Sequence, residues 1–455
     1  MQPVQPKYGY SMTVSACLWL GLFPLLQCGT YSSITHDKWV IMLILSGVTL
    51  LCFLFDLAFS VIRGRRFPAA LFRPRPLIPL LLAAALLLWT VLSCLCSEYG
   101  PDTWWLGGSA RYEGLLTQLC YLGLFFCFFF SRVSLKPVVL SGAAGLAVFF
   151  VIVMLQRGGG NPLGLYPAGR SYELNPEFQG TIGNIDMGTG YLLLLFSLFL
   201  YSLLGLVCAQ SAPDLPLRLK PKEDLNTLPL KSLLQAAVSL IGLCVSLFLI
   251  LTMDVQFGAI SLGVLLLFTA LRFLPKKWRL PLLILLIVLA LLVVWIWPGH
   301  GGGLWELHEV FHGRARLSFG SNRLAVWYYS LRLSALSPVV GGGSATFPSR
   351  FNRFLSDNGL TIPDEQDGVA LPNYFDNPHS EYISQLTDHG LPAMLLFLAL
   401  LLWSVFRRRD GWFPLPSPCS AAVLCYAVQA VFSFSVCIVA PMFWIILGIS
   451  FREQE

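Results

Sequence analysis

Residues 77–96 read LIPLLLAAALLLWTVLSCLC, a stretch without a charged side chain. A run of about 20 apolar residues is long enough to cross the hydrocarbon core of a bilayer as a helix. The rest of the chain is similar in character, because 56% of its 455 residues are hydrophobic and only 12% are charged, whereas soluble proteins carry about 25% charged residues. The sequence therefore predicts an all-α, polytopic integral membrane protein.

Hydropathy predicts twelve transmembrane helices. The first is too long for the apolar core of a cleavable signal peptide, so we expect it to remain as a span. The last two are so close in sequence that a single re-entrant hairpin is the alternative. The approximate ranges are 10–29, 39–61, 77–96, 114–131, 138–156, 187–208, 232–253, 257–273, 280–297, 390–406, 418–435 and 437–451.

These helices predict three parts of the chain. Residues 1–297 hold helices one to nine and an outer loop at 157–186, residues 298–389 form a large extracytoplasmic loop between helices nine and ten, and residues 390–455 hold helices ten to twelve. Long loops of this kind are usually functional or disordered. The pattern SNRLAVWYYSLRLSALSP at 321–338, with Ser321 as N-cap and Pro338 as stop, predicts a folded helix in the large loop.

The distribution of basic residues predicts the orientation. With a cytoplasmic N-terminus, 20 of the 30 basic residues fall on the inner side, so the positive-inside rule places both termini in the cytoplasm and all six histidines outside. The expected location is the cytoplasmic membrane. The inner residues are Lys7, Arg63, Arg65, Arg66, Arg73, Arg75, Arg132, Lys136, Arg218, Lys220, Lys222, Lys231, Arg272, Lys276, Lys277, Arg279, Arg407, Arg408, Arg409 and Arg452.

Charged residues gather in the large outer loop rather than in the helices. Six arginines lie in 298–353, whereas 354–389 has seven acidic residues and no lysine or arginine. Transport through the membrane usually needs charges or broken helices near the midplane, so the pattern favours chemistry at the outer face. Arginine suits phosphate oxygens because its planar fork donates two parallel hydrogen bonds. The alternative is that these charges only pair with one another in solvent.

The stretch NPHSEY at 377–382 directly precedes the tenth predicted span. Asn377 is a favoured N-cap and Pro378 a favoured first helical residue, which predicts His379 in the first turn. The positive end of the helix dipole would keep its imidazole neutral, although Asp376 and Glu381 oppose this effect. His379 is therefore a candidate general base, and an interfacial polar residue is the alternative.

Helical spacing predicts that His379, Ile383, Leu386 and Gly390 share the side of this helix that faces the bundle. We expect His389 to be an interfacial residue.

A metal site is a second possibility. LHEVFHG holds His308 and His312 four residues apart with Glu309 between them, which matches the H-E-x-x-H pattern of zinc proteases. Such a site needs a third ligand and a well-packed helix, and the flanking sequence is rich in glycine. The twelve cysteines lie in apolar segments without metal or redox spacing.

Two late motifs resemble a known family. SNRLAVW and SPVVGGGSATF within 321–347, followed by HSEYISQLTDHG at 379–390, resemble the paired motifs of the O-antigen ligase and O-antigen polymerase superfamily. Ligases of that superfamily have a histidine, then Asn, Ser or Gln, nine residues and a glycine, and His379, Ser380 and Gly390 fit this pattern. The segments RYEGLL (111–116) and Gly183-Asn184 are also similar, so the resemblance spans roughly residues 105–406.

The resemblance implies a substrate, a reaction and a site. The substrate would be a glycan on a polyprenyl diphosphate such as undecaprenyl diphosphate, transferred to a hydroxyl of a glycan, lipid or protein in bacterial cell-surface polysaccharide assembly. It implies no cofactor, no metal ion and no nucleic acid. His379 would act as the base. The diphosphate would bind Arg323, followed by Arg111, Arg316 and Arg314, and the supporting residues would be Glu381 and Tyr382.

The sequence leaves four alternatives to a glycan ligase open. A polysaccharide polymerase would use a second lipid-linked glycan as acceptor, and a protein O-glycosyltransferase would use serine or threonine. A transporter of the lipid-linked glycan and a membrane metalloprotease belong to other classes. Ala393 stands where ligases often have threonine, so the acceptor stays open.

Overall fold

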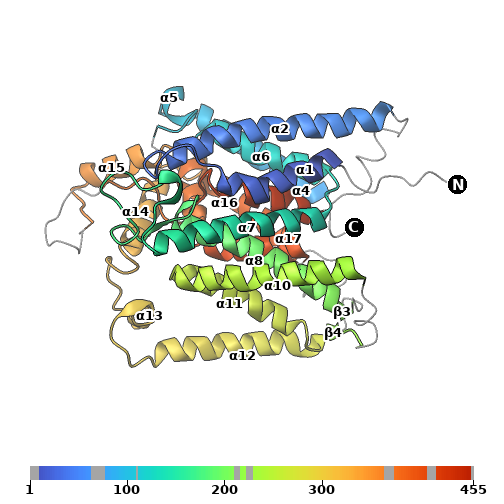
Figure 1. Ribbon diagram of the computed structural model, residues 1–455. Coiled ribbons are helices and arrows are strands. Elements are labelled where there is room, and N and C mark those ends of the chain that lie inside the picture. Colours follow the sequence, from blue (N-terminus) through green and yellow to red (C-terminus); the bar gives the residue numbers. More distant parts are fainter. Residues whose placement is uncertain are drawn as a thin grey trace.

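The computed structural model describes residues 10–62, 77–108, 111–209, 216–221, 229–362, 374–406 and 417–451 (Figure 1). Within these ranges the chain forms a bundle of helices with two short antiparallel strand pairs, β1–β2 and β3–β4. The elements are α1 (Tyr10–Cys17), a π-helix (Leu18–Leu22), a 3₁₀ turn (Phe23–Leu25), α2 (Ile34–Ile62), α4 (Leu77–Leu95), α5 (Pro101–Trp104), α6 (Leu115–Phe130), α7 (Leu135–Arg157), a 3₁₀ turn (Pro162–Gly164), β1 (Phe178–Gln179), β2 (Gly183–Asn184), α8 (Ile185–Val207), β3 (Cys208–Ala209), β4 (Arg218–Leu219), α10 (Leu230–Thr252), α11 (Gln256–Leu271), α12 (Lys276–Trp295), α13 (Gly302–Phe311), α14 (Arg323–Ser334), α15 (Phe347–Asp357), α16 (Glu381–Phe406), α17 (Pro418–Gln429) and α18 (Ala440–Ser450).

Seven of these helices are long and apolar enough to cross a membrane: α2, α4, α7, α8, α10, α12 and α16. This confirms the predicted class, an all-α membrane protein. The other five predicted spans form shorter apolar helical stretches, namely 10–25, α6, α11, α17 and α18. The count of twelve spans therefore stays a prediction.

Helix α8 lies at the centre of the bundle and packs against α7, α10, α11 and α17. Its start is fixed by Asn184, whose side chain accepts a hydrogen bond from the backbone N–H of Asp186 (2.8 Å), as an N-cap residue does. Helix α12, by contrast, has few contacts with the rest of the bundle. It packs chiefly on α13, and Arg279 is its one buried side chain within the described residues.

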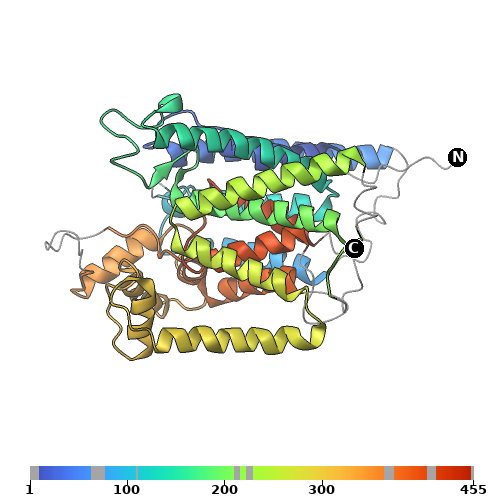
Figure 2. The same ribbon diagram turned by 60° about the horizontal axis from the view of Figure 1, so that its bottom comes forward.

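The two predicted outer segments lie at the same end of the bundle. Figures 1 and 2 show 157–186 at the same end of the bundle as α14 and α15, and Figure 1 shows the β3–β4 hairpin, which holds Arg218, at the opposite end. The placement of these ends across a membrane stays a prediction. Several residues that predict the orientation lie outside the described ranges: Lys7, Arg63, Arg65, Arg66, Arg73, Arg75, Lys222, Arg407, Arg408, Arg409 and Arg452.

The described part of the large loop is folded, as predicted, and contains α13, α14 and α15. The predicted N-cap of α14 was wrong. Ser321 and Asn322 both have left-handed backbones, with φ of 54° and 67°, so the helix begins one residue later than expected, at Arg323. Asn tolerates this conformation better than most residues.

Helix α16 begins at Glu381, nine residues before the predicted span, and breaks at Gly390. Gly390 has φ 80° and ψ 174°, a region that is open essentially to glycine alone. The turn at 337–346 packs against this break, since the N–H groups of Gly342 and Gly343 donate to the carbonyl of Asp388 (3.0 and 2.7 Å) and Leu391 donates to Pro338 (2.8 Å). The two sequence motifs therefore interlock.

This interlock changes which side of α16 is buried. The prediction that His379, Ile383 and Leu386 lie on the side of the helix that faces the bundle was wrong. The buried residues of the first half are instead mainly polar, and they contact the turn at 337–346 and the segment after α17. They are Glu381, Gln385, Thr387, His389 and Gly390.

Replacing Gly390 with alanine should destabilise the fold. A Cβ at this position would lie 2.0 Å from the carbonyl oxygen of Val339. The backbone strain and the overpacking each cost about 1–3 kcal/mol, so Gly390→Ala should unfold at a clearly lower temperature in a detergent melt. Gly123→Ala is the control. Gly123 lies in α6, and a Cβ at this position would meet no neighbouring atom within 4 Å. Equal melting of the two variants would contradict the role given to Gly390.

Candidate active site

His379 lies just before α16 rather than in its first turn. Asn377 does not cap the helix as predicted, because its Oδ1 accepts the N–H of His379 (2.9 Å) and forms an Asx turn. His379 accordingly has a left-handed backbone, with φ 51°. Ser380 takes the capping position, where its carbonyl accepts from the N–H of Ser384 (2.8 Å).

The imidazole of His379 is half-buried, and neither ring nitrogen has a hydrogen-bond partner among the described residues. Burial lowers the pKa of His379 to about 4, Arg323 and Arg111 lower it as well, and Asp376 opposes them. The group is therefore neutral at pH 7, as the sequence predicted, and a nitrogen is free to accept a proton.

The positive charges of Arg323 and Arg111 both lower the pKa of His379, but the two arginines have different partners of their own. Arg111 pairs with Asp376, with 2.7 Å between Nε and Oδ2. Arg323 has no carboxylate within salt-bridge distance among the described residues, and its buried Nε lacks a hydrogen-bond partner. Its guanidinium lies 5.6 Å from the ring centre of Phe257. Arg323 is thus a cation that can donate further hydrogen bonds, and it lies near a neutral histidine.

The other two candidate arginines lie after α13. Arg314 pairs with Glu309 (2.6 Å), and Arg316 is exposed beside the same carboxylate. The charged groups that act on His379 are Arg323, Asp376 and Arg111. The structure therefore brings His379 together with Arg323 and Arg111, but not with this second pair.

The residues of the H-E-x-x-H pattern have local partners. The Nδ1 atoms of His308 and His312 lie 3.0 Å and 2.8 Å from the carbonyl oxygens of Val294 and His308. Glu309 is held by Arg314. Within the described ranges, no group of three His, Cys, Asp or Glu side chains is arranged to hold a metal ion.

The site is supported by a non-helical segment, residues 430–439, between α17 and α18. The N–H of Glu381 donates to the carbonyls of Ala430 (2.9 Å) and Ser433 (2.8 Å), and its Oε2 accepts the N–H of Ser435 (2.6 Å). Glu113 accepts the N–H of Cys437 (2.8 Å). Two carboxyl groups from distant parts of the chain thus satisfy backbone groups that no helix satisfies.

Glu113 also binds the hydroxyl of Tyr121 (2.8 Å), and burial raises the pKa of Glu113 to about 8. Glu381 binds the backbone of segment 430–439 rather than His379, so the supporting role predicted for it stays a prediction. Tyr382 faces α17 and donates to the carbonyl of Ala427 (2.7 Å). It joins α16 to α17 and does not contact His379.

Two phenylalanines of segment 430–439 contact the site. The ring of Phe434 lies edge-on to His379, with centroids 5.6 Å apart, and the guanidinium of Arg111 lies 5.1 Å from the centre of the same ring. The ring centroids of Phe432 and Trp327 are 5.9 Å apart. The indole N–H of Trp327 donates to the carbonyl of Pro378 (3.0 Å). Trp327 therefore fixes the residue directly before His379.

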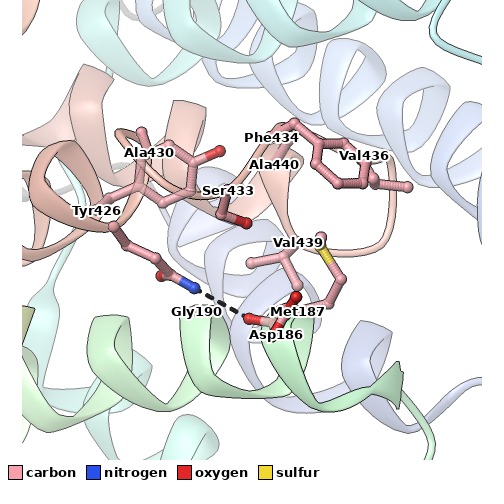
Figure 3. A pocket seen from close by; sticks show the side chains of 11 residues that line it. Asp186, Met187, Gly190, Tyr426, Ala430, Ser433, Phe434, Val436, Val439 and Ala440 are labelled. Atoms are coloured by element: carbon pink, nitrogen blue, oxygen red, sulfur yellow. Dashed lines mark hydrogen bonds between the residues drawn. The ribbon is translucent and has the colours of Figure 1, made fainter. Parts of the chain in front are cut away.

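A small pocket lies behind this segment, between it and the first turn of α8 (Figure 3). Figure 3 shows Asp186, Ser433 and Phe434 around it, together with the hydrogen bond from the side chain of Gln429 to the carbonyl of Asp186 (3.0 Å). The last residue of α17, directly before the segment, is consequently attached to the central helix of the bundle.

A buried polar chain runs along the first half of α16. Gln385 donates to Oε1 of Glu381 (3.0 Å) and accepts from Nδ1 of His389 (3.0 Å), and Nε2 of His389 lies 2.9 Å from Oγ of Ser344. The expectation that His389 is interfacial was wrong, since only 3% of its surface is exposed. The spacing of Glu381, Gln385 and His389 by four residues is the signal that could have revealed this chain.

Residues 240–398 match the O-antigen ligase family. The matched O-antigen ligase segment runs from α10 into α16 and contains Arg323 and His379, so the resemblance seen in the sequence is confirmed. No curated protein gives a significant match. The match and the apolar helices indicate a membrane enzyme with a glycan ligase-like or polymerase-like role.

The protonation of His379 can be tested directly. In a ¹³C-histidine NMR titration of the protein in nanodiscs, the resonance that disappears in His379→Gln should report a pKa near 4. Arg323→Gln removes a cation that disfavours imidazolium, so it should raise this pKa, yet leave it below 6.5 because burial persists. A wild-type pKa near 6.5 would contradict the buried, neutral imidazole.

Loss of the Glu381 carboxylate should loosen segment 430–439. Glu381→Ala leaves the N–H of Ser435 and the amide of Gln385 without partners, which costs about 1–3 kcal/mol for each buried group. Hydrogen exchange of a 430–439 peptide should therefore be much faster in Glu381→Ala than in the wild type. Glu381→Gln keeps an acceptor oxygen and should lie between the two. Unchanged exchange in Glu381→Ala would show that the carboxylate does not hold the segment.

Proposed function

We propose that the protein transfers a glycan from a polyprenyl diphosphate to an acceptor hydroxyl at the outer face of the cytoplasmic membrane. The observation that supports this most strongly is the pairing of a neutral His379 with Arg323. Among the described residues, both ring nitrogens of His379 are free and Arg323 has no carboxylate within salt-bridge distance. Glycan transfer of this kind needs a base and a stabilised leaving group.

In the proposed step, a nitrogen of His379 accepts the proton of the acceptor hydroxyl. The hydroxyl oxygen forms a bond to the anomeric carbon of the glycan while the bond from that carbon to the diphosphate oxygen breaks. The electron pair of that bond leaves with the polyprenyl diphosphate. Arg323 binds the developing charge, and Arg111 is available if it releases Asp376. The proton then passes from His379 to solvent.

The lipid part of the donor fits the surroundings of this end of the bundle. The two motifs lie between apolar helices, and the O-antigen ligase segment includes the second half of α10, all of α11 and α12, and most of α16. A polysaccharide polymerase uses the same donor and the same two roles, so it is the second candidate. It differs only in taking a lipid-linked glycan as acceptor.

The catalytic assignment is tested with purified protein, polyprenyl-diphosphate glycan and candidate acceptors. His379→Ala should lower transfer by about 10²–10⁴-fold, the usual contribution of a general base. Arg323→Gln should lower it by about 10–100-fold, as the loss of a charged hydrogen bond does. His308→Ala and Arg314→Gln are matched controls outside the site and should retain activity.

The same assay with a chelator distinguishes the enzyme classes. A glycan transferase that uses His379 and Arg323 in these roles should be insensitive to chelation. A metalloprotease would transfer no glycan in this assay, and its hydrolysis of a peptide substrate would be lost with the chelator and in His308→Ala. Full transfer activity in His379→Ala would refute the proposed mechanism.

A further inference from the structure

A second, larger pocket of about 560 Å³ lies beside His379. Its mouth is formed by Arg111 and Asp376, whose side chains are 36% and 32% exposed. Its inner wall is the first half of α16, where Gln385 and His389 are buried. Of its lining residues, the proposed step uses only Arg111, as a second cation for the diphosphate.

The charge of the pocket restricts what it can bind. Four carboxyl groups line it, from Glu113, Asp376, Glu381 and Asp388. The one arginine on its wall, Arg111, already pairs with Asp376. Burial raises the pKa of Glu113 to about 8 and that of Asp388 to about 7, so these two carboxyl groups are at least partly neutral. The described lining still holds no cation without a carboxylate partner, so a diphosphate or another anion would find no counter-charge there. Ligands that donate hydrogen bonds are favoured.

One carboxyl oxygen of Asp388 has no hydrogen-bond donor among the described residues. Its Oδ2 accepts the N–H of Ala345 (3.2 Å), and a further backbone hydrogen bond comes from Phe347. Its Oδ1 is buried and has no hydrogen-bond partner among the described residues. A buried carboxyl oxygen without a partner is costly, and a ligand hydroxyl in the pocket would satisfy it. Ser384, one turn earlier on α16, adds a hydroxyl on the same wall.

The remaining wall is apolar and lies next to the base. Phe347, Pro348, Pro378 and Phe434 line the pocket, and the ring of Phe434 also contacts His379, with 5.6 Å between centroids. Sugar rings combine hydroxyl donors with apolar C–H faces, so aromatic rings together with carboxylates suit them. A ring in this pocket would lie close to His379.

We propose that this pocket binds the uncharged sugar ring of the acceptor, with Asp388 accepting a hydrogen bond from one of its hydroxyls. This inference rests on the proposed function and adds to it: the acceptor is a glycan, and it binds in the carboxyl-lined pocket, whereas the diphosphate binds at Arg323. The acceptor hydroxyl would then approach His379 past Phe434.

The test measures binding rather than transfer, so it does not depend on the proposed reaction. Saturation-transfer-difference NMR with the full chain in nanodiscs compares glucose, N-acetylglucosamine and glucuronic acid as probes, without donor. The wild type should bind at least one of the two uncharged sugars and discriminate against glucuronic acid. Asp388→Asn keeps an oxygen for Ala345 but loses the free carboxylate oxygen, and it should bind at least about tenfold more weakly.

Asp357→Asn is the matched control, because Asp357 is exposed and pairs with Arg353 outside the pocket. Ser384→Ala should also weaken binding, and it decides the matter if Asp388→Asn melts at a lower temperature. Equal binding in the wild type and both pocket variants, or no binding of either uncharged sugar by the wild type, overturns the proposal. Loss of binding in Asp388→Asn together with normal transfer in His379→Ala would refute the mechanism but retain the sugar site.

Discussion

The candidate site depends on the hydrogen bonds that two buried carboxyl groups make to the unwound backbone between α17 and α18. Glu113 and Glu381 accept the N–H groups of Cys437 and Ser435, and the N–H of Glu381 is in turn bound by carbonyls of the same segment. Backbone without helical partners is tolerated at membrane depth only where protein groups satisfy it. These bonds allow Phe432 and Phe434 to leave the helical path and contact Trp327 and His379.

A second constraint fixes the start of α16. The glycine turn at 341–343 fits against the break at Gly390, so the first half of α16 is held by backbone hydrogen bonds rather than by lipid. That half presents polar side chains to the protein, while the second half, after Leu391, is apolar and suited to the membrane. One helix therefore supports the site and anchors it in the bilayer.

The sequence predicted the positions of the helices well and the irregular parts poorly. Hydropathy locates membrane helices because the backbone must satisfy itself in lipid. It could not locate the break at 430–439, since Phe432, Phe434 and Val436 are equally apolar in either conformation. The groups that stabilise this break are far away in sequence, with Glu113 324 residues from Cys437.

The candidate site, too, could be predicted only in part. His379 and Arg323 could be picked out from motifs, and the structure brings them together. Their local geometry could not be predicted, because Asn377 is equally suited to cap a helix or to form an Asx turn, and only tertiary contacts select the second. The buried chain from Glu381 to His389 was within reach of sequence reasoning, since three polar residues spaced by four are unusual in a membrane helix.

Helix α12 has a consequence of its own for how the protein responds to its membrane. Its 20 residues extend about 30 Å, close to the thickness of a bilayer's hydrocarbon layer, and almost all of its surface faces away from the bundle. Packing against the bundle therefore restrains its tilt little, so the bilayer and the anchoring side chains at its two ends, such as Trp278 and Trp295, set it. A change in lipid composition would move α12 and the attached α13. The movement would reach the start of α14, because Glu306 of α13 accepts the N–H of Gly320 (2.9 Å) and the carbonyl of Gly320 accepts the N–H of Arg323 (3.2 Å).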